Sequence, residues 1–236
     1  MNARDSARQH LFLSGIGAVA ILVICWLGLS RQNSVQLADK LVVGGVLIGI
    51  AAFGASLAVR PRWTAGIMKD ASHGLEDGQT AIPGRRRVGH HPDCDRFDGH
   101  RARLRGRIVC AGCAGMALGA AFSITLAVLY IVLPMKMDLA LSVILVHLGI
   151  ILVGAYFIDV GLHNASGVSR MRASALLPLA FLSVTVGLLE STGNVSYSLI
   201  GIVVSVLWLD TRIQVSIRRH ERICQDCGEA CKSCGI

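Results

Sequence analysis

Charged and aromatic residues are scarce in this chain of 236 residues. Only 16% of the residues are Asp, Glu, Lys or Arg, whereas soluble globular domains carry about 25%. Phe, Trp and Tyr make up 5% and are not interleaved with basic residues in a base-stacking pattern, so specific nucleic-acid binding is not expected. No nucleotide loop, nucleophile elbow or carboxylate pair is evident, and motifs therefore assign no reaction.

Apolar residues are abundant instead, at 53% of the chain. A helix that crosses the hydrocarbon core of a bilayer needs about 20 mostly apolar residues. Four runs meet this length: Leu11–Ser30, Leu41–Val59, Ala114–Leu133 and Leu139–Val160. Two shorter runs, Ala173–Leu189 and Val195–Leu209, flank a small polar turn and predict a tight helical hairpin, with a re-entrant or buried pair as the alternative. The sequence thus predicts an all-α polytopic membrane helix bundle of about six transmembrane helices.

Basic residues fall on one side of this predicted bundle. The segment between the second and third helices holds ten Lys and Arg residues, and the connection after the fourth helix and the C-terminal tail hold most of the others. The intervening turns hold only Arg31, Lys40 and Lys136. Because cytoplasmic loops carry the excess of Lys and Arg, we expect a multi-pass protein of the cell membrane with both termini in the cytoplasm. Anionic lipid is the simplest partner for the net charge of +8.

Four regions follow from this pattern. Residues 1–60 are expected to form an N-terminal two-helix membrane hairpin, and residues 61–113 a cytoplasmic basic Cys/His loop. Residues 114–217 are expected to form a four-helix membrane bundle, and residues 218–236 a cytoplasmic Cys-rich tail. In the reducing cytoplasm, the loop and tail thiols favour metal or redox chemistry over structural disulfides. Cys25, inside the first helix, is most simply a small buried hydrophobe.

The Cys/His loop contains a metal-ligand spacing. His91, Cys94 and His100 precede a Cys-x2-Cys pair, Cys110 and Cys113, whose two sulfurs are able to reach one ion. Cys94 with either His100 or His91 supplies a second pair for a tetrahedral site, and zinc suits such mixed thiolate and imidazole ligands, with iron or copper as alternatives. A bound metal would supply the core that this loop lacks. The alternative is that these are ordinary loop residues.

The pair Cys110 and Cys113 also opens the third membrane helix, where unpaired backbone NH groups and the helix dipole stabilise a thiolate. Gly115 and Gly119 follow at a small-xxx-small spacing that lets another helix approach closely, and Gly45 and Gly49 repeat that spacing on the second helix. The loop would then be fixed onto a closely packed pair of helices.

The segments "HHPDC", "RF", "CAGCAG" and "FIDVGLHNASGVSRMR" resemble an uncharacterised family of prokaryotic integral membrane proteins, catalogued as domain of unknown function 2085. The resemblance covers roughly Gly89 to Leu189. It places the family's elements at His91, Pro92, Cys110, Cys113, Gly115, Asp159 and Arg172. This chain departs from the pattern at Gly112 and Ala114, and in having Cys94 after the His-Pro. The resemblance implies a membrane location and a site, and no known activity.

The C-terminal tail carries four cysteines at a second metal-like spacing. Cys224, Cys227, Cys231 and Cys234 follow the pattern Cys-x2-Cys-x3-Cys-x2-Cys. Four thiolates hold zinc or an iron–sulfur cluster, and the sequence favours zinc at these cysteines over a cluster. A flexible metal-scavenging tail is one alternative. A mixed site shared by tail and loop is another.

Few polar residues lie inside the predicted membrane spans. His147 falls near the middle of the fourth helix, and Asp159 lies three turns on at its basic end, so we expect the two to share a broad face. We expect His147 to hydrogen-bond to a neighbouring helix, and Asp159 either to anchor a helix end or to approach the Cys/His loop near His163 and Asn164.

Three functional hypotheses remain from the sequence. The first is a membrane-anchored, non-catalytic zinc protein with a structural, sensing or assembly role. The second is a membrane thiol or metal-centred oxidoreductase with Cys110 and Cys113 as the reactive pair. The third is a metal-ion transporter, for which His147 is the only central ligand. The expected partners are the lipid bilayer and a metal ion, and the sequence identifies no protein partner.

Overall fold

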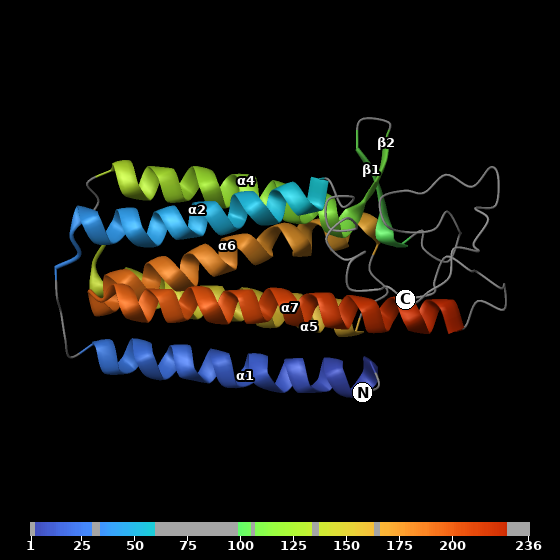
Figure 1. Cartoon of the computed structure of the whole chain (residues 1–236), viewed down its shortest axis with the longest axis horizontal. Helices are drawn as coiled ribbons and strands as arrows, with labels where there is room; N and C mark the ends of the chain where they lie inside the picture. The colour runs from blue at the N-terminus through green and yellow to red at the C-terminus, as the bar shows by residue number, and fades with distance from the viewer. Residues whose placement is uncertain are drawn as a thin grey trace, which may run out of the picture.

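The structure is a computed structural model that describes residues 3–29, 34–59, 99–104, 107–133, 137–162 and 166–225. Within these ranges the elements are α1 (Ala3–Gly28), α2 (Leu37–Val59), β1 (Arg101–Leu104), β2 (Arg107–Cys110), α4 (Ala111–Val132), α5 (Leu139–Leu162), α6 (Gly167–Thr192) and α7 (Val195–Gln225), labelled as in Figure 1. The six helices described are each long and apolar enough to cross a membrane. The chain is therefore an all-α multi-pass membrane protein whose helices contact the lipid bilayer.

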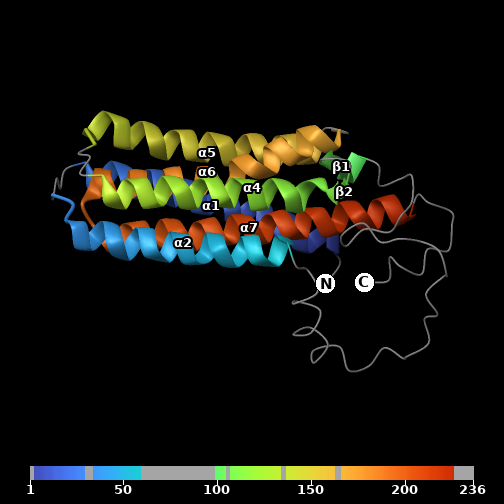
Figure 2. The same cartoon turned by 90° about the horizontal axis from the view of Figure 1, so that it is seen from above.

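The helices run up and down in alternation (Figure 1). One end of the bundle holds the starts of α1, α4 and α6, the ends of α2, α5 and α7, and the β1–β2 hairpin (Figure 2). We call it the basic end, because the Arg-rich connections of the sequence belong to it. The helix ends that flank the basic connections thus share one end of the bundle, as predicted.

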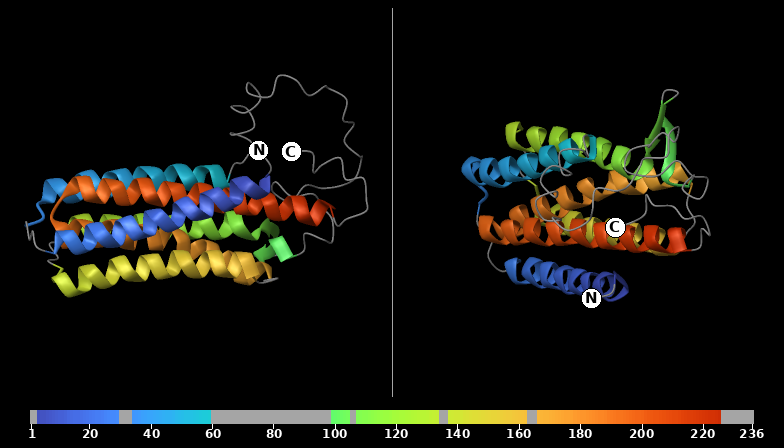
Figure 3. Two further views of the ribbon diagram at one scale, coloured as in Figure 1. Left: turned by 90° about the horizontal axis from the view of Figure 1, so that it is seen from below. Right: turned by 45° about the vertical axis from the view of Figure 1, so that its right-hand side comes forward.

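Helix α6 is the most buried helix of the bundle and packs against α4 on one side and α5 on the other. Helix α1 packs mainly against α7, and α2 mainly against α4, so the two helices of residues 1–60 have different main partners (Figure 3). One apolar cluster joins α1, α5, α6 and α7 around Trp208 and Leu177, and it includes Cys25, which is 2% exposed as expected for a buried hydrophobe. A second cluster joins α2, α4, α6 and α7 around Val43 and Leu189.

The two short apolar runs belong to full-length spans, and the re-entrant alternative is wrong. Helix α6 begins at Gly167, where the Ser166 side chain accepts a hydrogen bond from the Ser169 NH at 3.4 Å. It ends at Gly193, whose φ of 59° is the left-handed conformation that favours glycine. Helix α7 continues to Gln225, so the predicted tail from residue 218 begins inside a helix. The apolar runs did not include the first turn of α6 or the last turns of α7, because those turns are polar and lie at the basic end.

Backbone contact between α4 and α6 occurs at the predicted glycine pair. A Cβ at Gly115 would overlap the carbonyl oxygen of Met171, and one at Gly119 would overlap that of Ala175. The prediction that these glycines admit a close helix neighbour is confirmed, and the neighbour is α6. It is wrong for Gly45 and Gly49, since no atom lies within 4 Å of a Cβ built at either residue.

Two carboxylates inside the spans, Glu190 and Asp210, are paired with basic side chains. Glu190 accepts a hydrogen bond from the Tyr130 hydroxyl at 2.5 Å and lies 3.4 Å from the Lys40 ammonium, near the end of the bundle opposite the basic end. Asp210 lies 2.9 Å from the His10 ring and joins α7 to α1. Beside it, the Trp208 indole donates to the Ser14 carbonyl at 3.1 Å. Asp210 is an interior residue of α7, although it directly follows the apolar run Val195–Leu209.

The glycine contact makes a prediction about stability. Gly119→Ala should lower the free energy of unfolding in detergent by about 1–3 kcal/mol, because the added methyl group must separate α4 from α6. Gly45→Ala is the matched control, and should be neutral or stabilising by up to about 1 kcal/mol through helix propensity alone. Denaturant unfolding followed by circular dichroism measures both. Equal stabilities of the two variants would contradict a tight contact at Gly119.

Candidate functional site

A two-stranded hairpin precedes α4 at the basic end. Strands β1 and β2 are antiparallel, with Arg101 opposite Cys110 and Leu104 opposite Arg107. His100 comes directly before β1, so the register places it at the same end of the hairpin as Cys110. Gly167, the first residue of α6, lies against the Arg101 carbonyl, which seats the hairpin on the bundle. The sequence analysis missed this hairpin, although the alternation of Arg with other residues on either side of Arg105 and Gly106 was its signal.

The hairpin delivers a pair of cysteines to the start of α4. Cys110 is the last residue of β2 and the N-cap of α4 with extended backbone angles, while Cys113 lies in the first helical turn. The two thiols contact each other within hydrogen-bonding reach. Cys110 is 7% exposed, whereas Cys113 is half-buried. The pair is therefore close enough to act as a unit, and Cys113 is its more accessible member.

A pocket of about 310 Å³ opens beside this pair. Its volume falls within the range of about 300–1,000 Å³ that is typical of small-molecule sites. Its lining residues come from the hairpin, α4, α5, α6 and α7, and are His100, Cys110, Gly112, Cys113, Tyr156, Val160, Arg170, Ser174, Arg212, Ile213, Ser216, Ile217 and Arg219. We call this space the cationic pocket, because three arginines line it.

Two of the arginines are held by hydrogen bonds. Arg212 donates from Nε to the Tyr156 hydroxyl at 2.8 Å and from Nη2 to the Gly112 carbonyl at 3.3 Å. The Arg212 guanidinium is thereby fixed across the first turn of α4, where it acts electrostatically on Cys113. Arg219 donates from Nη1 to the Val160 carbonyl at 2.7 Å. A glycine at position 112 leaves room for Arg212, because a Cβ there would lie 3.2 Å from its Nη2.

Positive charge exceeds negative charge around the pocket. Asp159 at the end of α5 attracts both Arg170 and Arg219, and these two arginines repel each other. Among the residues described, neither Arg170 nor Arg212 forms an ion pair, and the Asp159 Oδ2 atom is buried without a hydrogen-bond partner. Asp159 thus acts on two arginines of the pocket without lining it, and its expected approach to the Cys/His loop stays a prediction. His163 and Asn164 lie outside the described residues.

The nine predicted metal ligands divide into three groups. His100, Cys110 and Cys113 line one pocket, as grouped by the sequence. His91, Cys94, Cys227, Cys231 and Cys234 lie outside the described residues, and Cys224 lies in the last turn of α7 with its side chain also outside them. Within the described ranges, no group of three His, Cys, Asp or Glu side chains has a metal-binding arrangement. A zinc or iron–sulfur centre therefore stays a prediction.

His147 is not part of this pocket. Its ring is exposed on the lipid-facing surface of α5 and hydrogen-bonds to the Val143 carbonyl at 2.8 Å, one turn earlier in its own helix. The expected bond to a neighbouring helix is wrong, because Val143 belongs to the same helix. Asp159, by contrast, is half-buried toward the bundle, so the two residues do not share a functional face.

The fold and the pocket together define a multi-pass membrane protein, with six helices in the part of the chain that the structure describes and a dithiol beside an arginine cluster. No family model, curated protein or solved structure matches the chain. The resemblance to domain of unknown function 2085 stays a prediction. The function is accordingly argued from the geometry of the pocket.

The Arg212 anchor makes the next prediction. Tyr156→Phe removes the hydroxyl that accepts from Arg212 Nε, and should lower the free energy of unfolding by about 1–3 kcal/mol, because a buried charged donor loses its partner. It should also change the alkylation rate of Cys113 by a small maleimide. The control is Tyr197→Phe, a half-buried tyrosine of α7 outside the pocket, which should alter neither quantity. Identical effects of the two variants would show that Tyr156 does not fix Arg212.

Proposed function

We propose that this protein is a membrane thiol–disulfide oxidoreductase with Cys110 and Cys113 as its reacting pair. The observation that carries the proposal is the contact between the two thiols at the N-terminus of α4, on the wall of a pocket of ligand-binding size. Unpaired NH groups at a helix N-terminus and a nearby guanidinium both favour a thiolate. Both features adjoin this pair, because Cys113 lies in the first turn of α4 and Arg212 donates to the Gly112 carbonyl next to it. Burial and the neighbouring Cys110 thiol act in the opposite direction and favour the neutral thiol at Cys113.

The exposures assign a role to each thiol. Cys113 faces the pocket, so its thiolate attacks one sulfur of a substrate disulfide, and the substrate S–S bond breaks as one substrate thiolate leaves. The Cys110 thiolate then attacks the Cys113 sulfur of the mixed disulfide. The second substrate thiolate leaves, and a Cys110–Cys113 disulfide forms. The substrate gains two electrons and takes up two protons, which the protein dithiol has released.

Zinc held by His100, Cys110 and Cys113 is a second candidate. The observation that favours it is that these three predicted ligands line the same pocket. Thiolate and imidazole are ligands that zinc prefers, and a fourth ligand would come from His91 or Cys94. In this case the site has a structural, sensing or assembly role, and the two thiolates do not exchange electrons.

We infer that the basic end faces the cytoplasm and that the protein resides in the cell membrane. The distribution of Lys and Arg supports this orientation, since the basic connections meet at one end of the bundle. It agrees with the proposed chemistry, because cytoplasmic thiols are kept reduced and able to donate electrons.

Redox titration tests the first candidate. In buffers of reduced and oxidised dithiothreitol, Cys110 and Cys113 should convert together, as a two-electron couple, in peptide mapping after thiol trapping. With oxidised glutathione, whose single thiol cannot cyclise to release the protein sulfur, Cys110→Ser should accumulate a mixed disulfide at Cys113. Cys113→Ser should form none, because the pocket-facing nucleophile is gone. Cys25→Ser is the matched control and should leave the couple unchanged, since Cys25 is buried in the core.

Metal analysis of the same samples separates the two candidates. The redox proposal requires two-electron behaviour that survives chelation. The zinc proposal requires about one zinc per chain that is lost in Cys110→Ser and retained in a version lacking residues 225–236. Thiols that titrate independently in metal-free protein would eliminate the oxidoreductase.

The orientation makes a separate prediction. In intact cells, a membrane-impermeant maleimide should label Ser196→Cys, an exposed position near the start of α7, and should not label Arg222→Cys in its last turn. A variant background without the native cysteines isolates the two sites. Labelling of Arg222→Cys alone would reverse the proposed orientation.

A further inference from the structure

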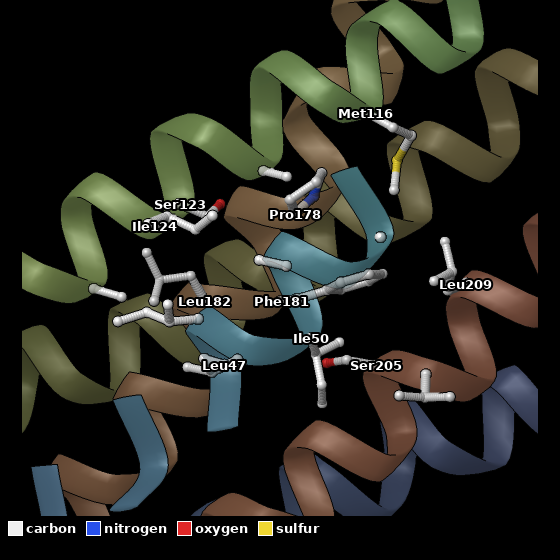
Figure 4. Close-up of a pocket in the computed structure, with 16 residues that line it drawn as sticks. Leu47, Ile50, Met116, Ser123, Ile124, Pro178, Phe181, Leu182, Ser205 and Leu209 are labelled. Atoms are coloured by element: carbon white, nitrogen blue, oxygen red, sulfur yellow. The ribbon is translucent and has the colours of Figure 1, made fainter. Parts of the chain in front are cut away.

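A second, apolar space lies among α2, α4, α6 and α7 (Figure 4). Its volume is about 60 Å³, and we call it the apolar slot. Its lining is Leu47, Ile48, Ile50, Ala51, Gly54, Met116, Ala120, Ser123, Ile124, Ala127, Pro178, Phe181, Leu182, Ser205, Val206 and Leu209. Ser123 and Ser205 are its only hydroxyl-bearing members, and the Ser205 hydroxyl is engaged with the Gly201 carbonyl of its own helix at 2.8 Å. The slot therefore has room for about two methylene groups of a hydrocarbon chain, and the rest of such a chain would extend into the lipid beside it.

The slot and the cationic pocket adjoin along three helices. On α4, Cys113 lines the pocket and Met116 lines the slot; on α6, the pair is Ser174 and Pro178; on α7, it is Arg212 and Leu209. Each pair is three or four residues apart, which is about 4.5–6 Å along a helix. The linings of the two spaces are thus about one helical turn apart on each of these three helices.

On α6, the boundary between the cationic pocket and the apolar slot carries a polar backbone group without its usual helical donor. Pro178 has no backbone NH, so the carbonyl of Ser174 lacks the donor that a helix normally supplies four residues later. Ser174 belongs to the cationic pocket and Pro178 to the apolar slot. The change from a polar to an apolar lining therefore takes place within one turn.

The slot also opens sideways toward lipid. It lies between α2 and α7, where Ile50 and Val206 on its rim are 38% and 47% exposed. Phe181 extends into the slot in Figure 4, and its ring stacks on Trp208 with centroids 6.1 Å apart. A chain that enters from the bilayer between α2 and α7 therefore contacts Phe181, and Trp208 reports on its arrival.

We propose that the cationic pocket and the apolar slot together bind an anionic single-chain amphiphile, with a phosphate or carboxylate head at the arginines and its hydrocarbon tail in the slot. Charge complementarity selects the head, because Arg170 and Arg212 form no ion pair within the described residues. The narrow slot selects one chain over a ring or a branched tail. This binding does not require the thiols to exchange electrons, so it stands or falls separately from the proposed function.

Dodecyl phosphate is the probe, added to the full-length protein in micelles of a neutral detergent, with dodecanol and inorganic phosphate as comparisons. Two signals report binding in a variant whose only tryptophan is Trp208 (Trp26→Phe, Trp63→Phe). The tail should shift Trp208 fluorescence saturably, and the head should slow maleimide alkylation of Cys113 about tenfold. Dodecanol should bind about tenfold or more weakly than dodecyl phosphate, because it lacks the charge-assisted hydrogen bonds.

Matched substitutions separate head from tail. Arg170→Gln should weaken dodecyl phosphate about tenfold, whereas Arg172→Gln, an exposed residue two positions on, should leave it unchanged. Gly54→Phe fills the slot from a position where a side chain has open space, and should abolish the Trp208 signal. Gly45→Phe adds the same ring to the same helix outside the slot, and should have no effect.

The outcomes decide the proposal in either direction. Equal effects of Arg170→Gln and Arg172→Gln would overturn the head assignment, and binding unaffected by Gly54→Phe would overturn the tail assignment. Inorganic phosphate that protects Cys113 as well as dodecyl phosphate does, at equal concentration, would replace the amphiphile with a soluble anion. The redox couple is measured without the probe, so a failed couple leaves this test intact.

Discussion

The backbone contact between α4 and α6 is the constraint on which the site depends. Gly115 and Gly119 bring α4 directly onto the carbonyls of Met171 and Ala175. In a bilayer, helices gain little from hydrophobic contact with each other, so van der Waals packing of this kind carries much of their association. The same contact sets the first turn of α4 beside the first turns of α6. Cys113 and Arg170 consequently share one pocket, although 57 positions separate them in the sequence.

Polar groups are placed where the bundle satisfies them. Lys40, Tyr130 and Glu190 form a compact ionic cluster, with the ammonium 4.5 Å from the centre of the tyrosine ring. Such pairing offsets the cost of removing charge from water. The cationic pocket differs, because its arginines outnumber the one carboxylate, Asp159, that acts on them within the described residues. This imbalance supports the proposal that the pocket binds an anionic ligand.

The sequence predicted the helices well and the site only in part. Hydropathy located all six spans because burial in lipid demands long apolar runs, and it failed at the polar ends of α6 and α7, where that demand stops. The Cys-x2-Cys spacing identified Cys110 and Cys113 because four consecutive residues bring their own ends together. The sequence did not identify Arg170, Arg212 and Tyr156 as pocket residues. Many arginines lie near the predicted membrane surface, and only helix packing decides which of their side chains face the interior of the bundle. At Gly45 and Gly49 the sequence predicted a close helix contact that the structure does not have. The glycine spacing allows another helix to approach closely, but it does not ensure that one packs there.

The unequal ends of the bundle bear on how the chain enters a membrane. Three connections join consecutive helices at the end of the bundle opposite the pocket. They are residues 29–36, 133–138 and 193–194. With the basic end retained on the side of synthesis, as proposed above, only these short stretches must be carried across the hydrocarbon, and they include just two cationic residues, Arg31 and Lys136. Translocation thus involves little hydrated charge, and the hairpin with its thiols assembles without ever leaving the compartment in which the ribosome made it.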